Sequence, residues 1–170
     1  GLPPGVLNVV PGYGPTAGQA LIEHPGVDKI SFTGSPAVGK RIMQHAAERA
    51  VRVGLELGGK SPNIVFADAD IEAAVRASSS GIFFNAGQVC SAGSRIFVHR
   101  DRYEEFVDRL VRRAGRIRVG DPLNPETSMG PLISGGQMER VLGYISKGRA
   151  EGAELVCGGQ RAADVGYFVE

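Results

Sequence analysis

Hydrophobic and polar positions along the 170-residue chain fall into short blocks that switch between two periods. Residues 27–33 and 51–57 are rich in β-branched, aromatic and leucine residues, as is typical of strands. Residues 36–49, between them, carry apolar residues on one face of a helix, namely Val38, Ile42, Met43 and Ala46. The pattern therefore predicts a strand, a helix and a second strand in that order.

Similar blocks lie on both sides of this unit. Before it, the sequence predicts a strand over residues 6–10 and a helix over residues 14–24. After it, the pattern predicts strands over residues 62–66, 94–99, 154–157 and 166–170, and helices over residues 71–84, 101–115 and from residue 135 onward.

Short polar side chains stand in front of most of the predicted helices. Ser35 precedes Pro36, and the later helices follow Asp70, Asp101 and Ser134. Such side chains accept hydrogen bonds from the free N–H groups of a first helical turn, and proline suits the first helical position. We therefore predict that these residues mark the helix starts.

Strands that alternate with helices through short turns predict an α/β fold with a parallel sheet and right-handed crossovers. Gly58 and Gly59 end one such series, and a second begins with residues 62–66. We therefore expect a parallel, Rossmann-like sheet portion in residues 1–58 and part of a second α/β domain in residues 59–170. Ligands bind such sheets beyond the carboxyl ends of the strands.

The charge balance argues against nucleic-acid binding, because Lys plus Arg total 19 and Asp plus Glu total 18. Arginines cluster between residues 102 and 118, but acidic residues accompany them, so we interpret this segment as a solvated helix face with i,i+4 ion pairs. No apolar run approaches the ~20 residues that span a membrane, and the first residues do not have the pattern of a signal peptide. We expect a cytoplasmic protein.

Two cysteines cannot form a disulfide framework, which favours a reducing compartment. We interpret Cys157 as a structural strand residue, and the absence of a Cys/His cluster excludes a zinc site. His24, His45 and His99 show no metal or Cys–His spacing, so we interpret them as surface or structural residues. Both ends look cut, and we expect a fragment of a longer enzyme that is poorly stable alone.

The most informative stretch is the loop around Cys90. Gly87 and Gly93 bracket this cysteine, so the backbone can bend sharply and approach a ligand closely. Small residues around the sulfur leave room for a substrate. Cys90 is a nucleophile if backbone N–H groups or a cation stabilise its thiolate; the alternative is a buried structural cysteine.

Two further groups lie at predicted strand ends. Gly34 and Ser35 open a strand-to-helix turn, with Gly39 five residues after the first glycine, and free N–H groups at such a turn bind phosphate. The turn lacks the established phosphate-loop spacings, so a simple helix cap is the alternative. Glu56 ends an apolar strand and is a general base if partial burial raises its pKa, or else an ordinary acid in contact with water.

The three groups together suggest one reaction. A cysteine attacks an aldehyde to form a thiohemiacetal, transfer of hydride to a nicotinamide leaves a thioester, and a carboxylate helps water to hydrolyse it. Backbone N–H groups at the cysteine turn stabilise the oxyanion. A cysteine acyl-transfer enzyme or thioesterase without a redox step, or a non-catalytic module of the same fold, stays open at this point.

Two segments resemble the signatures of the NAD(P)-dependent aldehyde dehydrogenase superfamily. Residues 55–62 (LELGGKSP) are similar to its glutamate signature, and residues 84–95 (FNAGQVCSAGSR) to its cysteine signature. Residues 32–35 with Gly39 resemble its coenzyme phosphate turn, and residues 5–10, 129–132 and 166–169 also fit. The resemblance covers essentially the whole chain and is closest to the group that acts on aliphatic and aromatic aldehydes.

The resemblance implies a role for each matching position. It makes Cys90 the nucleophile and Glu56 the general base. It divides the chain into the C-terminal part of a coenzyme-binding domain, residues 1–58, and the N-terminal part of a catalytic domain, residues 59–170. The implied NAD or NADP site contains Gly34, Ser35, Gly39, Leu57, Gly14, Pro15 and Val38, and the implied substrate tunnel contains Phe84, Val89 and Ser91.

The resemblance also implies a soluble homodimer or homotetramer that takes a small aldehyde and binds neither nucleic acid nor membrane. Family members are longer at both ends. Their side-chain oxyanion donor, the residues that hold the two riboses and the oligomerisation hairpin match no segment of this chain. The sequence therefore names neither the aldehyde nor the preference between NAD and NADP.

Overall fold

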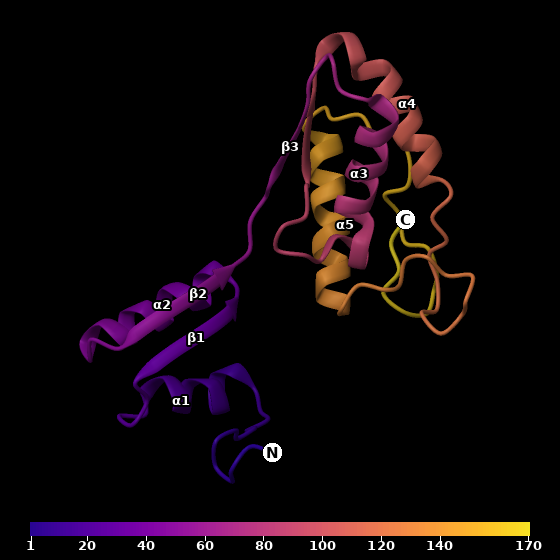
Figure 1. The fold of residues 1–170 in the computed structure, drawn as a ribbon. Coiled ribbons are helices and arrows are strands. Elements are labelled where there is room, and N and C mark those ends of the chain that lie inside the picture. The colour runs from indigo at the N-terminus through magenta and orange to yellow at the C-terminus, as the bar shows by residue number, and fades with distance from the viewer. The chain divides into compact units, whose positions relative to one another are not determined.

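The computed structural model describes residues 1–170 and divides them into two compact units, Gly1–Gly58 and Gly59–Glu170. Figure 1 shows the elements of each unit along the chain. No helix combines the length and the apolar character needed to cross a membrane. The predicted α/β class is confirmed, because both units contain parallel strands joined through helices.

The first unit is built on a parallel strand pair covered by a helix. It contains a π-helical turn at Gly14–Gly18, α1 at Gln19–Glu23, β1 at Lys29–Gly34, α2 at Pro36–Glu48 and β2 at Arg52–Leu57. The strands pair in register from Lys29 with Arg52 to Gly34 with Leu57. The helix α2 lies along both strands (Figure 1) and closes a small core around Ile30, Ile42 and Ala46.

The start of α2 agrees with the sequence prediction. The backbone N–H of Val38 donates to Ser35 Oγ at 3.3 Å, and Pro36 occupies the first turn. Gly39, in the next turn, is buried, and a Cβ added there would lie 2.9 Å from Leu57 Cδ2. A glycine at this position therefore lets α2 approach β2 closely.

The second unit repeats the arrangement with a larger core. Its elements are β3 at Pro62–Val65, α3 at Ile71–Phe83, a 3₁₀ turn at Phe84–Gly87, β4 at Arg95–Val98, a 3₁₀ turn at Arg100–Arg102, α4 at Tyr103–Ala114 and α5 at Gly135–Ala150. Strands β3 and β4 are parallel, and α3 packs against α4. Val65, Ile71, Val75 and Phe106 form the buried cluster, with Phe106 only 1% exposed.

Two of the predicted helix caps in this unit are confirmed and one is wrong. Asp70 Oδ1 accepts from the N–H groups of Glu72 and Ala73, and Ser134 Oγ accepts from that of Gln137. Asp101 does not cap α4, because a 3₁₀ turn intervenes and the helix begins only at Tyr103. His99 caps the 3₁₀ turn, because its Nδ1 accepts from the Asp101 N–H at 3.4 Å, and no side chain caps α4.

The predicted strands over residues 6–10 and 154–157 are wrong. Neither segment pairs with a neighbouring strand, and Val9 and Val156 are exposed. Residues 166–170 form only an isolated bridge between Arg161 and Val169. β-rich composition marks a segment that suits a sheet, but a strand needs a partner for its backbone groups. Cys157 is consequently exposed and belongs to no strand, contrary to the prediction.

Candidate active site

The Cys90 loop begins with a left-handed turn at the end of α3. Asn85, Ala86 and Gly87 have φ angles of 51°, 53° and 74°. Left-handed backbone costs little for glycine but is unfavourable for a residue with a Cβ. A Cβ added at Gly87 would also lie 3.2 Å from the Ile82 carbonyl oxygen. The predicted sharp bend at Gly87 is therefore confirmed, and it extends over two non-glycine residues.

Cys90 and Ser91 occupy a tight turn beyond this bend. The N–H of Ala92 donates to the Val89 carbonyl at 3.1 Å and closes the turn. Cys90 is an exposed free thiol, so the alternative of a buried structural cysteine is wrong. Its own N–H donates to no group in this chain, which leaves a donor beside the sulfur. Phe84 is 73% exposed, Ser91 is exposed and Val89 is half-buried.

The far side of the loop is tied to β3 and α3. The N–H of Gly93 donates to the Gly81 carbonyl at 3.3 Å, and a Cβ added at Gly93 would meet Asn63 Cβ at 3.5 Å. Asn63 Nδ2 donates to the buried Ser78 Oγ at 2.7 Å. The return of the chain into β4 is therefore held by a polar contact between the strand and the helix.

The predicted phosphate turn lies between β1 and α2. Gly34 and Ser35 are exposed, and Ser35 Oγ accepts the capping hydrogen bond, so its O–H is left to donate. A Cβ added at Gly34 would meet the tip of the Phe32 ring, so a larger residue there would require that ring to move. The turn therefore presents a free hydroxyl at the N-terminus of a helix, where the dipole favours an anion.

The other predicted coenzyme residues are divided between surface and core. Gly14 and Pro15 belong to the exposed π-helical turn, and Val38 is exposed on α2. Gly39 is buried against the half-buried Leu57, which pairs with Gly34 at the ends of β2 and β1. Gly34 and Leu57 thus lie side by side at the carboxyl edge of the sheet.

Glu56 lies at the same edge of the first unit. It pairs across the strands with Thr33, and both residues are exposed. The partial burial expected for a general base is therefore not present within this unit. The register nevertheless places Glu56 one residue before the carboxyl end of β2, near the edge where ligands bind in parallel α/β folds.

Sequence reasoning missed two residues that hold the cysteine loop. The Gln88 side chain bonds both within the turn and to the backbone of Ile133, and Asn63 bonds to Ser78. The signal for Asn63 was an amide on the inward face of a short strand. No local signal existed for the bond between Gln88 and Ile133, because these two residues are 45 positions apart in the sequence.

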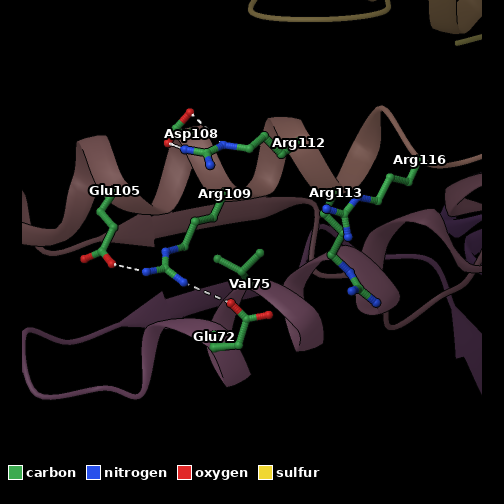
Figure 2. Close-up of a pocket in the computed structure, with 8 residues that line it drawn as sticks. All are labelled: Glu72, Val75, Glu105, Asp108, Arg109, Arg112, Arg113 and Arg116. Carbon is green, nitrogen blue, oxygen red and sulfur yellow. Dashed lines mark hydrogen bonds and ion pairs between the residues drawn. The ribbon is translucent and has the colours of Figure 1, made fainter.

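A charged groove between α3 and α4 is lined by none of the predicted catalytic or coenzyme residues (Figure 2). Arg109 bonds to Glu72 at 3.0 Å and to Glu105 at 2.8 Å, and Arg112 pairs with Asp108. The hydrogen bond from Arg112 lowers the pKa of Asp108, and the same bond raises the pKa of Arg112. The i,i+4 pairs confirm the interpretation of this segment as a solvated helix face.

No group of three or more His, Cys, Asp or Glu side chains is placed to hold a metal ion. His24 Nδ1 accepts from the Gly26 N–H, and His99 lies beside Asp101. None of the three histidines is hydrogen-bonded to Cys90.

Comparisons with known proteins agree on one family. Residues 1–170 match the profile described as the aldehyde dehydrogenase family. Retinal dehydrogenase 2 of Mus musculus is 57% identical over 172 residues, covering 100% of this chain and 33% of the relative. Mitochondrial aldehyde dehydrogenase of Homo sapiens is 53% identical over 172 residues, covering 100% of this chain and 33% of the relative.

A solved structure gives the same result for the fold. The NAD+ complex of an aldehyde dehydrogenase from Bacillus cereus is similar with a TM-score of 0.92 and 53% identity, covering 95% of this chain and 33% of that chain. The chain therefore spans about a third of the length of the relatives that it matches.

Proposed function

Because the chain belongs to the aldehyde dehydrogenase family, we propose that the enzyme containing it oxidises an aldehyde to a carboxylic acid with NAD(P)+. The observation that carries the proposal is Cys90, an exposed thiol on a tight turn of small residues with an unused backbone N–H. A thiol held in this way is accessible to a carbonyl carbon and has a donor for the oxygen.

Cys90 is the proposed nucleophile. Its thiolate Sγ forms a bond to the carbonyl carbon, and the carbonyl π electrons move to the oxygen, which accepts a hydrogen bond from the Cys90 N–H. When bound, NAD(P)+ supplies the hydride acceptor that converts this thiohemiacetal into a thioester. Val89 and Ser91 flank Cys90 in the turn and Phe84 lies in the preceding 3₁₀ turn, and these three residues are the proposed substrate contacts.

Glu56 is the proposed base of the second half of the reaction. Its carboxylate takes a proton from water as the water oxygen bonds to the thioester carbon. The carbon–sulfur bond then breaks, the carboxylic acid leaves and Cys90 returns as a thiolate. Glu56 lies near the end of β2 and is exposed, so its carboxylate is available for this role.

The first unit has features that fit a dinucleotide. The free O–H of Ser35, the exposed Gly34 backbone and the N-terminus of α2 suit a pyrophosphate. Leu57, next to Gly34, is the proposed contact of the nicotinamide, and Gly14, Pro15 and Val38 are the proposed contacts of the adenine. Gly39 contributes indirectly, by letting α2 pack against Leu57.

The remaining assignments are proposed at the level of the longer protein. Residues 1–58 contribute to the coenzyme-binding domain and residues 59–170 to the catalytic domain. We place the enzyme in a reducing, cytoplasmic setting because Cys90 and Cys157 are both free and exposed. A homodimer or homotetramer is the proposed assembly.

The decisive experiment replaces the nucleophile in the full-length enzyme. We expect Cys90→Ser to lower aldehyde-dependent NAD(P)H production by at least about a thousandfold, because a hydroxyl is a far weaker nucleophile at neutral pH. Cys157→Ser is the matched control and should keep full activity. Dehydrogenase activity that survives in Cys90→Ser would show that the assignment of the nucleophile is wrong.

A further inference from the structure

Gln88, two residues before Cys90, uses both ends of its side-chain amide. Its Nε2 donates to the Asn85 carbonyl at 3.2 Å, which lies inside the left-handed turn. Its Oε1 accepts from the Ile133 N–H at 3.0 Å, which lies 45 residues further along the chain. One side chain thus connects the turn that precedes the cysteine to a distant segment of the same unit.

The turn needs such support. Asn85 and Ala86 adopt left-handed backbone angles, which residues with a Cβ keep only where surrounding contacts hold them. Asn85 Nδ2 donates to the Gln88 carbonyl at 3.3 Å, and the Gln88 N–H donates to the Asn85 carbonyl at 3.1 Å. Together with the bond from Gln88 Nε2, these hydrogen bonds between Asn85 and Gln88 close the turn.

The distant end of the connection is itself anchored. Leu132 is buried, and its N–H donates to the Tyr167 carbonyl at 2.9 Å. Ser134 then caps α5. The Ile133 side chain is 82% exposed, so this residue contributes its backbone N–H and not its side chain. Gln88 therefore ties the cysteine loop to a point that is held on both sides.

We propose that Gln88 is a positioning residue for the reaction at Cys90. By closing the left-handed turn and fastening it to Ile133, it sets where the thiol and the Cys90 N–H point. The Gln88 amide offers a donor and an acceptor at the same tip, so an ionised glutamate loses the bond to the Asn85 carbonyl and alanine loses both side-chain bonds. This inference rests on the proposed role of Cys90 as nucleophile.

The test uses the full-length enzyme with Cys157→Ser, so that Cys90 is the reactive thiol of this segment. Gln88→Ala and Gln88→Glu are compared by the rate of the first-turnover NAD(P)H burst, by KM for the aldehyde, and by the rate of alkylation with iodoacetamide against pH. Misplacing a reacting group by about 1 Å costs on the order of 100-fold in rate. We expect the burst in Gln88→Ala to slow by at least about tenfold with little change in KM.

Alkylation gives a readout that needs neither coenzyme nor aldehyde. We expect its pH profile to change in Gln88→Ala, with Gln88→Glu between this variant and the parent. Gln44→Ala and Gln44→Glu are the matched controls, because Gln44 is exposed on α2 and its side chain makes no hydrogen bond. Both controls should leave every readout unchanged.

Three outcomes would overturn the inference. The first is burst and alkylation rates within about twofold of the parent in folded Gln88 variants. The second is a lower melting temperature with those rates unchanged, which would give Gln88 a purely structural role. If Gln88→Ala does not fold, the nearly isosteric Gln88→Glu is measured in its place. The third outcome is parental burst and alkylation rates in that variant. Dehydrogenase activity that survives in Cys90→Ser would instead refute the proposed function. Alkylation of the Gln88 variants, which keep Cys90, would still test whether Gln88 positions the thiol.

Discussion

The two residues proposed to carry out the chemistry lie at or just beyond the ends of elements. Cys90 follows α3 through a strained turn, and Glu56 comes just before the end of β2. Neither residue is buried, so neither owes its place to the core. Each is positioned by the backbone around it. The left-handed turn precedes Cys90, and the parallel pairing of β1 with β2 fixes the position of Glu56.

The proposed role of Glu56 as a base can be tested separately from that of Cys90, because the two residues would act in successive steps. In the full-length enzyme, Glu56→Gln keeps the size and lacks the base, so thioester formation should continue while hydrolysis slows by on the order of 100-fold. Rapid-mixing measurements should then show a first-turnover burst of NAD(P)H followed by a slow steady state. Glu48→Gln, at the exposed end of α2, is the control. A parental steady-state rate in Glu56→Gln would rule out the base role.

The sequence was most informative where the signal is local. The bend at Gly87 and the cap at Ser35 follow from residue type and immediate neighbours, and both are present. The bond from Gln88 to Ile133 depends on how distant segments fold together, which no local pattern encodes. The sequence left open whether Glu56 is partly buried or in contact with water, because burial depends on the neighbours of a strand and not on its own residues; in this chain Glu56 is exposed.

At the scale of elements, helices were predicted better than strands. Residues 36–49 and 71–84 form α2 and α3 within one residue of the predicted ends. A helix forms its backbone hydrogen bonds within its own segment, and its capping residues lie at its ends. The local sequence therefore predicts where a helix begins and ends. Residues 6–10 and 154–157 have strand-like composition but no partner, so they form no strand.

The N-terminal cap of α3 tests whether a local capping residue stabilises the start of a helix. Asp70→Ala removes the acceptor for two N–H groups at 3.0 and 3.1 Å, which should lower the free energy of unfolding by about 1 kcal/mol. Asp70→Asn should recover most of the loss. Asp68→Ala, an exposed carboxylate without a hydrogen bond two residues earlier, should change little. Denaturant unfolding of the full-length enzyme measures all three, and equal losses in Asp68→Ala and Asp70→Ala would contradict the capping argument.

At the scale of the whole molecule, the second unit leaves one face of its strand pair open. Ile64 and Phe97 are cross-strand partners of β3 and β4, both more than half exposed, on the face opposite the core. A two-stranded sheet with this open face is marginal by itself.

The exposed face with Ile64 and Phe97 gives opposite predictions for the 170-residue chain and for the full-length enzyme. In the 170-residue chain, Ile64→Thr with Phe97→Thr should reduce binding of the dye ANS and aggregation, because threonine keeps strand propensity and removes exposed apolar surface. In the full-length enzyme, where we expect the face to be covered, the same pair should lower the unfolding free energy by about 3 kcal/mol or more. Val65→Thr, in the buried cluster, should destabilise both proteins. Unchanged stability of the full-length double variant would mean that the face stays in contact with water.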